Sequence, residues 1–161
     1  MKNINFILSE GTIEKYCGTE KNVAIPDGVK TIGRSAFENC TTIESVTLSD
    51  SVREIGNGAF LGCKHLRTVK LSATLQKIDD WAFAGCENLC EISFPDTLVS
   101  IGNNAFNHCI SLENIEIPAS VEELSAGAFS DCEKLKKVSL PCKFHSEKES
   151  ILFQSPNAQA V

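Results

Sequence analysis

The segment Ile55-Gly-Asn-Gly-Ala-Phe-Leu-Gly-Cys-Lys-His-Leu-Arg-Thr-Val-Lys-Leu71 is the repeating unit of this chain, because the same residue types return every 23 residues. A fixed period of this length is the signature of a solenoid, in which each coil packs on its neighbours. Five copies stay in phase, and their shared columns are Ala36-Phe37, Ala59-Phe60, Ala82-Phe83, Ala105-Phe106 and Ala128-Phe129; Cys40, Cys63, Cys86, Cys109 and Cys132; Ile43, Leu66, Leu89, Leu112 and Leu135; Val46, Val69, Ile92, Ile115 and Val138; Leu48, Leu71, Phe94, Ile117 and Leu140.

Each unit is expected to contain three pieces. The Leu-x-x-Val-x-Leu segment is rich in β-branched residues and ends in period-two alternation, which predicts a short strand. A second apolar pair, such as Val52 and Ile55, predicts another short extended piece. Ala, Phe, Cys and Leu then follow at three-residue steps, the spacing of a helical or 3₁₀ turn. The first strand is ended by Pro or Ser at Pro26, Ser49, Ser72, Pro95, Pro118 and Pro141.

Both ends of the array depart from the repeat. Alternation of Ile4, Phe6 and Leu8 predicts a strand with one buried face, and a turn at 10–12 leads into a second strand at 13–17. At the other end the register breaks after residue 141: Phe144 and residues 151–153 are expected to cover the last coil, and residues 155–161 to form a fraying tail. We therefore expect a single domain over 1–161, with an N-terminal cap at 1–22, repeats at 23–141 and a C-terminal cap and tail at 142–161.

The repeat unit resembles the 23-residue leucine-rich repeat of the BspA-like (Treponema pallidum-type) family, over residues 23 to about 141. The departures are modest: Asp79 and Ser125 replace the Gly after Ile, and Leu124 replaces that Ile. The resemblance implies a right-handed arc of about five to six coils, α/β or mostly β, with parallel strands on its concave face. It also implies adhesion roles: host-protein binding or coaggregation.

Composition narrows the function classes. A net charge of -6 and a pI near 5.1 argue against nucleic acid as a partner. No apolar stretch approaches the ~20 residues of a membrane helix, so membrane insertion is not expected. The N-terminus lacks a signal-peptide pattern. Five of the eight cysteines fall in the inward column, at a coil spacing unsuited to disulfides, which predicts reduced thiols. From this sequence alone we expect a cytoplasmic location; if an upstream signal was removed, we expect the cell surface or secretion.

The polar residues that alternate with the inward columns of the first strand are expected to line the concave face. A repeat protein usually binds along this surface. The alternative is that they form only a soluble polar ladder. The residues predicted to bind a partner are Lys70, Glu91, Ser93, Asn114, Glu116 and Lys137.

Trp81 occupies a repeat position that is otherwise small or polar. It is either an exposed contact residue, of the type that anchors a partner, or an indole packed over Leu61 or a nearby loop. Cys90 lies in a charged column and is expected to be an exposed, incidental thiol. The paired acids Asp79 and Asp80 are expected to be exposed loop charges.

No arrangement of residues indicates catalysis. A ladder with one Cys every 23 residues does not converge on a metal, and the chain has no nucleophile elbow, zinc-protease motif or P-loop. We therefore expect no metal, no cofactor and no enzyme activity. The sequence predicts a rigid module that binds another protein; the alternative is an intracellular structural or scaffolding protein without host contact. Homo-oligomers formed through the solenoid ends are a further option.

Overall fold

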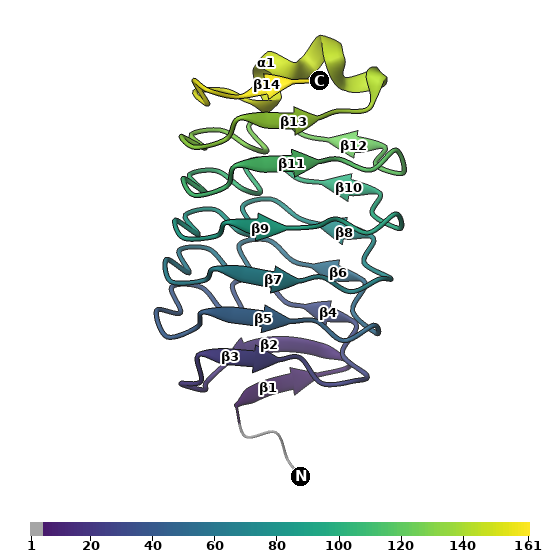
Figure 1. Ribbon diagram of the computed structural model, residues 1–161. Coiled ribbons are helices and arrows are strands. Elements are labelled where there is room, and N and C mark those ends of the chain that lie inside the picture. Colours follow the sequence, from purple (N-terminus) through teal and green to yellow (C-terminus); the bar gives the residue numbers. More distant parts are fainter. Residues whose placement is uncertain (1–4) are drawn as a thin grey trace.

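The computed structural model describes residues 5–161 and shows a β-solenoid of about six coils of ~23 residues with little helix (Figure 1). Each coil has three sides: a strand of two or three residues, a second short strand and a series of tight turns. Val46 lies opposite Val23 and Val69, so neighbouring strands pair at the 23-residue period of the sequence. The predicted fold class is confirmed.

The first side, here called the long-strand face, carries the strand predicted at the end of each repeat. Its side chains alternate between buried and exposed, as Asn22, Val23 and Ala24 do. The strands are parallel and run in the order of the chain: β3 (Asn22–Ala24), β5 (Ser45–Thr47), β7 (Thr68–Lys70), β9 (Glu91–Ile92), β11 (Asn114–Glu116), β13 (Lys137–Ser139) and β14 (Gln159–Ala160).

The second side, here called the short-strand face, carries the second extended piece of each repeat, as predicted. It is one uninterrupted sheet that begins with an antiparallel hairpin and continues with parallel strands. Its members are β1 (Phe6–Ser9), β2 (Thr12–Tyr16), β4 (Thr31–Ile32), β6 (Glu54–Ile55), β8 (Lys77–Ile78), β10 (Ser100–Ile101) and β12 (Glu123–Leu124).

The third side carries the Ala-Phe-x-x-Cys segments, which form turns rather than a continuous helix. Bonds from residue i+3 to residue i recur, as from Cys63 N to Phe60 O, but a residue with positive φ interrupts each run. The phenylalanine rings stack with centroids 4.7–5.2 Å apart from Phe37 to Phe129, and Tyr16 extends the stack at 4.8 Å. This aromatic column forms the centre of the core.

The N-terminal hairpin largely follows the prediction. β1 and β2 are joined through Glu10 and Gly11, both at positive φ, as a tight hairpin requires. Leu8, however, is 46% exposed instead of buried, because the β1–β2 register shifts between Ile7 and Leu8. Ile4, which was expected to begin the strand, lies outside the described residues.

The C-terminal residues differ from the prediction. A 3₁₀ helix η1 (Cys142–Glu147) and α1 (Lys148–Ile151) leave the repeat, but residues 151–161 return to it. Ser155 occupies the cysteine column and donates to Phe129 O at 2.7 Å, and β14 pairs with β13. The expected fraying tail is therefore wrong: this segment builds one more coil, with buried Ile151 in the alanine column.

Candidate functional site

The six residues predicted to bind a partner all lie along the long-strand face. Five are on its strands: Lys70 on β7, Glu91 on β9, Asn114 and Glu116 on β11, and Lys137 on β13, while Ser93 follows β9 directly. All six are exposed. Their common orientation follows from strand alternation, since the residues between them point into the core. Five of the six line two adjoining grooves, whereas Lys70 lies outside both.

The grooves coincide with an interruption of the long-strand face between β9 and β11. These two strands do not pair, and Figure 1 shows them more widely spaced than their neighbours. Within residues 5–161, the expected bonds from Glu113 N to Cys90 O and from Phe94 N to Glu116 O are not formed. Most other coils form the same bonds: Arg67 N to Glu44 O at 2.8 Å, Lys136 N to Glu113 O at 2.8 Å, Leu48 N to Lys70 O at 2.9 Å and Ile117 N to Ser139 O at 2.9 Å. Among the described residues the bond from Leu71 N to Ser93 O is also missing, although β7 and β9 still pair at Thr68–Glu91 and Val69–Ile92.

Phe94 is one residue that differs from the repeat at this interruption. It stands in a column that is otherwise Leu or Ile, and its larger ring is only half-buried. The ring packs edge-on against Phe106, with centroids 5.6 Å apart and planes at 69°. A phenyl ring needs more volume than the Leu or Ile side chains of this close-packed column, and the ladder is interrupted at this residue.

A second difference at the interruption is a side-chain hydrogen bond between loops that is missing there. His65 Nδ1 bonds to Thr41 O at 2.6 Å, Asn88 Nδ2 donates to Lys64 O at 2.8 Å, and Asn157 Nδ2 donates to Glu133 O at 2.8 Å, so each of these three side chains links its coil to the preceding one. Ser111 holds the same repeat position before β11, and within the described residues its short side chain makes no such bond. The coil that carries β11 therefore lacks this link. Lys134 at the same position of the next coil makes no such side-chain bond either, but its backbone N bonds to Ile110 O at 3.3 Å.

The larger groove has a volume of about 600 Å³ and is lined by Ile92, Ser93, Phe94, Asp96, Asn114, Ile115, Glu116, Pro118, Lys137 and Ser139. The adjoining one, about 400 Å³, adds Glu91, Glu113 and Cys90. Within the described part of the chain, Glu113 is paired with Lys136 at 3.0 Å, whereas Glu91, Asp96 and Glu116 form no ion pair. The opening is thus apolar at its base and mainly acidic at its rim.

Trp81 lies elsewhere, where the chain leaves the short-strand face after β8. Its side chain is 43% exposed, and its φ of +57° is uncommon for a bulky residue. The conformation belongs to the repeat rather than to Trp81, because the equivalent positions also have positive φ: Ser35, Gly58, Asn104 and Gly127. The indole is therefore presented at the surface on a backbone that favours small residues.

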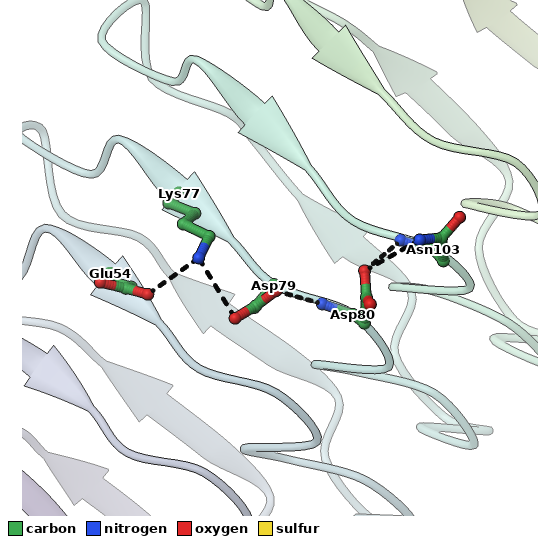
Figure 2. Close-up of polar contacts among 5 residues, drawn as sticks. All are labelled: Glu54, Lys77, Asp79, Asp80 and Asn103. Atoms are coloured by element: carbon green, nitrogen blue, oxygen red, sulfur yellow. Dashed lines mark hydrogen bonds and ion pairs between the residues drawn. The ribbon is translucent and has the colours of Figure 1, made fainter.

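Figure 2 shows the polar contacts that precede Trp81. Lys77 Nζ contacts Glu54 Oε1 at 3.2 Å and Asp79 Oδ2 at 3.3 Å, and the hydrogen bond to Glu54 raises the pKa of Lys77. Asp80 Oδ1 accepts from Asn103 N at 2.7 Å. Asp79 and Asp80 are half-buried and link three coils, so the expectation of exposed loop charges is wrong.

Four cysteines of the inward column act as hydrogen-bond donors between coils. Cys63 Sγ donates to Phe37 O at 3.0 Å, and Cys86, Cys109 and Cys132 do the same at 3.2 Å. Burial raises the pKa of Cys63 and of Cys132 to about 12, and it also raises the pKa values of Cys86 and Cys109. These thiols are neutral structural groups. Cys90 is exposed, as predicted, and its thiol donates to Arg67 O at 3.5 Å.

A family model for the BspA-type leucine-rich repeat region, in six copies, matches residues 12–136 and 55–161. The chain belongs to the BspA-type leucine-rich repeat family. The resemblance seen in the sequence is therefore confirmed, and the family match also covers the additional C-terminal coil. Leucine-rich repeats generally form non-enzymatic surfaces that bind other proteins.

Solved structures agree with this assignment. A leucine-rich repeat protein of T. pallidum is 32% identical, with a TM-score of 0.90 over 99% of this chain and 80% of that protein. One from Bacteroides ovatus is also 32% identical, with a TM-score of 0.73 over 81% of this chain but only 36% of its own. A leucine-rich cell surface protein of Faecalibacterium prausnitzii is 28% identical, with a TM-score of 0.50, over 83% of this chain and 52% of that one. No curated protein matches the sequence.

No group of three or more His, Cys, Asp and Glu side chains within residues 5–161 is arranged to hold a metal ion. No helix in that part of the chain has the length and apolar character needed to cross a membrane.

Proposed function

We propose that this chain is an adhesion-type module that binds another protein through its long-strand face, with the opening between β9 and β11 at the centre of the contact. The observation that carries the proposal is the position of this opening: it lies among the exposed residues Glu91, Ser93, Asn114, Glu116 and Lys137. The surrounding coils are rigid and repetitive, so binding costs the module little ordering entropy.

Family membership supports a protein partner, and a structural relative named as a cell surface protein supports display outside the cell. Trp81 is proposed as a separate, secondary contact because it is exposed, follows β8 of the short-strand face and lines neither groove. The alternative is an intracellular scaffold, which would bind proteins of its own cell and no host protein.

A pair of charge reversals in one coil tests the proposal. Glu116→Lys places the change on β11 of the long-strand face, while Glu123→Lys places the same change on β12 of the short-strand face. Both residues are exposed, so both variants are expected to fold. Binding would be measured by biolayer interferometry against immobilised plasma and extracellular-matrix proteins.

The proposal expects saturable binding to at least one of these proteins, weakened at least about tenfold by Glu116→Lys and by less than about twofold by Glu123→Lys. Equal effects of the two changes would overturn the assignment of the long-strand face. Binding only to proteins of the producing cell would favour the scaffold.

Association through the solenoid ends is proposed as a secondary property. Phe153 is 59% exposed beside the last coil, and β14 is the outermost strand of its sheet. Sedimentation velocity over a concentration series would show a dimer or longer assembly, which Phe153→Ser should weaken. A single monomer species at every concentration would exclude it.

A further inference from the structure

The interrupted ladder leaves main-chain groups available on two facing strands. On the β9 side these are Cys90 O and Phe94 N, and on the β11 side they are Glu113 N and Glu116 O; none has a backbone partner within residues 5–161. Such groups sit at the two ends of a solenoid, but here they occur in its middle. An exposed strand edge is a template for pairing with another extended chain.

The surroundings of these groups define the side chains that a pairing segment would need. Ile92 and Ile115 are buried at the base of the opening, and half-buried Phe94 lies beside them. Glu91 and Glu116 are exposed at its rim. Since side chains of a strand alternate between its two faces, a fitting segment has apolar residues facing the base and charged ones facing the rim.

The charge at the rim determines which charge a partner segment must carry. Glu91, Asp96 and Glu116 form no ion pair among the described residues, and Lys137 is the one cation that lines the larger groove. Three carboxylates against one ammonium group make the rim attractive to Lys or Arg on a partner, especially at low salt.

We infer that the opening between β9 and β11 binds an extended basic segment of a partner protein by strand addition. The segment pairs its main chain with the free groups of β9 and β11, places apolar side chains over Ile92 and Ile115, and directs Lys or Arg toward Glu91 and Glu116. This rests on the proposed function and names the kind of partner that the long-strand face takes. Main-chain bonds supply affinity in this mode, and alternate side chains supply specificity.

A synthetic peptide of about eight residues that alternates Lys and Val is the probe, since it matches both the apolar base and the acidic rim. Fluorescence anisotropy would measure its affinity for the full chain. A second peptide with the same side chains but methylated at alternate backbone nitrogens retains the charge and loses main-chain donors. We expect saturable binding of the first peptide, and at least about tenfold weaker binding of the second.

Phe94→Leu is the decisive protein variant because it restores the residue type of Leu48 and Leu71 in the same column and changes no charge. With the smaller side chain, the amides of Phe94 and Glu113 are expected to join the ladder. Hydrogen exchange at these two amides should slow, and the affinity for the alternating peptide should fall at least about tenfold. Ile117→Leu in the same column is the matched control and should change neither.

Equal binding of the two peptides, or unchanged peptide affinity in a Phe94→Leu protein whose amides have become protected, would overturn the inference and leave only charge attraction. Absence of saturable binding up to about 1 mM peptide would overturn it as well. These failures stay distinguishable from failure of the proposed function: if a protein partner still depends on Glu116, the long-strand face binds it without strand addition.

Discussion

The phenylalanine side of the solenoid and the long-strand face differ in how continuously successive coils are bonded to one another. From Phe37 to Phe129 the stack is continuous, and backbone bonds such as Phe83 N to Ala105 O and Phe106 N to Ala128 O join successive coils at 2.7–2.8 Å. On the long-strand face, the ladder stops at β9 and resumes at β11. The coils are thus held together on one side and separated on another.

This difference shows how a repeat protein can acquire a local site without losing its fold. β8, β10 and β12 remain paired on the short-strand face, so the opening is confined to one side of the coil. The changes that accompany it are small: Phe94 in a Leu or Ile column, and Ser111 at the position where His65, Asn88 and Asn157 bond to the preceding coil. The stability of the array and the shape of its surface are therefore set by different columns.

Among the substitutions that test this difference, Phe83→Ala has the largest expected effect on the free energy of unfolding. Phe83 is fully buried between Phe60 and Phe106, at centroid distances of 5.0 and 5.2 Å. Truncation leaves a cavity in the central column and should lower the free energy of unfolding by about 3–5 kcal/mol. Urea denaturation would measure this loss.

Phe94→Ala is the matched truncation at the edge of the opening. Phe94 is half-buried and lies outside the stack, so the expected loss is about 1 kcal/mol. Equal losses for Phe83→Ala and Phe94→Ala would remove the distinction between the stable side and the open face.

The cysteine column gives the next largest effect, and it depends on pH. Thiols of the unfolded chain titrate near their ordinary pKa of 9.0, whereas burial raises the pKa of native Cys63 to about 12. The stability contributed by the neutral thiol is complete below about pH 9 and is lost as the pH rises toward 12, by about 1.4 kcal/mol per pH unit.

Cys63→Ser removes one such thiol. The free energy of unfolding of the variant should therefore fall less steeply above about pH 9 than that of the parent protein. At neutral pH the change should cost little, since Ser155 shows that a hydroxyl in this column can donate to a Phe carbonyl. Urea denaturation of parent and variant between pH 8 and about pH 11 would compare the slopes. Parallel slopes would show that Cys63 does not titrate with unfolding.

The sequence alone predicts the regular parts of the molecule because each column recurs in five copies of the repeat. It fixes the burial of Val46, Phe83 and Cys109, and it places Glu91 and Glu116 on one exposed face. It does not predict the opening, since Phe94 looks like a conservative replacement and its effect arises only when its ring meets Phe106.

The sequence did not predict the C-terminal coil, for another reason. The helical residues 142–151 interrupt the period, and β14 pairs with β13 at a separation of 22 residues instead of 23. Once Ser155 is aligned with Cys132, the return of the repeat can be seen in the sequence. The contacts of Asp79 and Asp80 could not be predicted in this way, because their partners Lys77 and Asn103 depend on how the corners of three coils stack.

Substitution of Trp81 has the smallest expected effect on the free energy of unfolding. It tests whether a residue that departs from the repeat can shape the surface without contributing to stability. Because the indole is exposed, Trp81→Ala should change the free energy of unfolding by less than about 1 kcal/mol. Trp81→Gly introduces the residue found at Gly58 and Gly127 and relieves the cost of a positive φ, about 1 kcal/mol, so it should be at least as stable as Trp81→Ala. Urea denaturation of both variants would show the order. A loss above about 2 kcal/mol in Trp81→Ala would mean that the indole packs on the coil and belongs with Phe83, whereas a neutral result leaves Trp81 as a second contact surface, independent of the opening between β9 and β11.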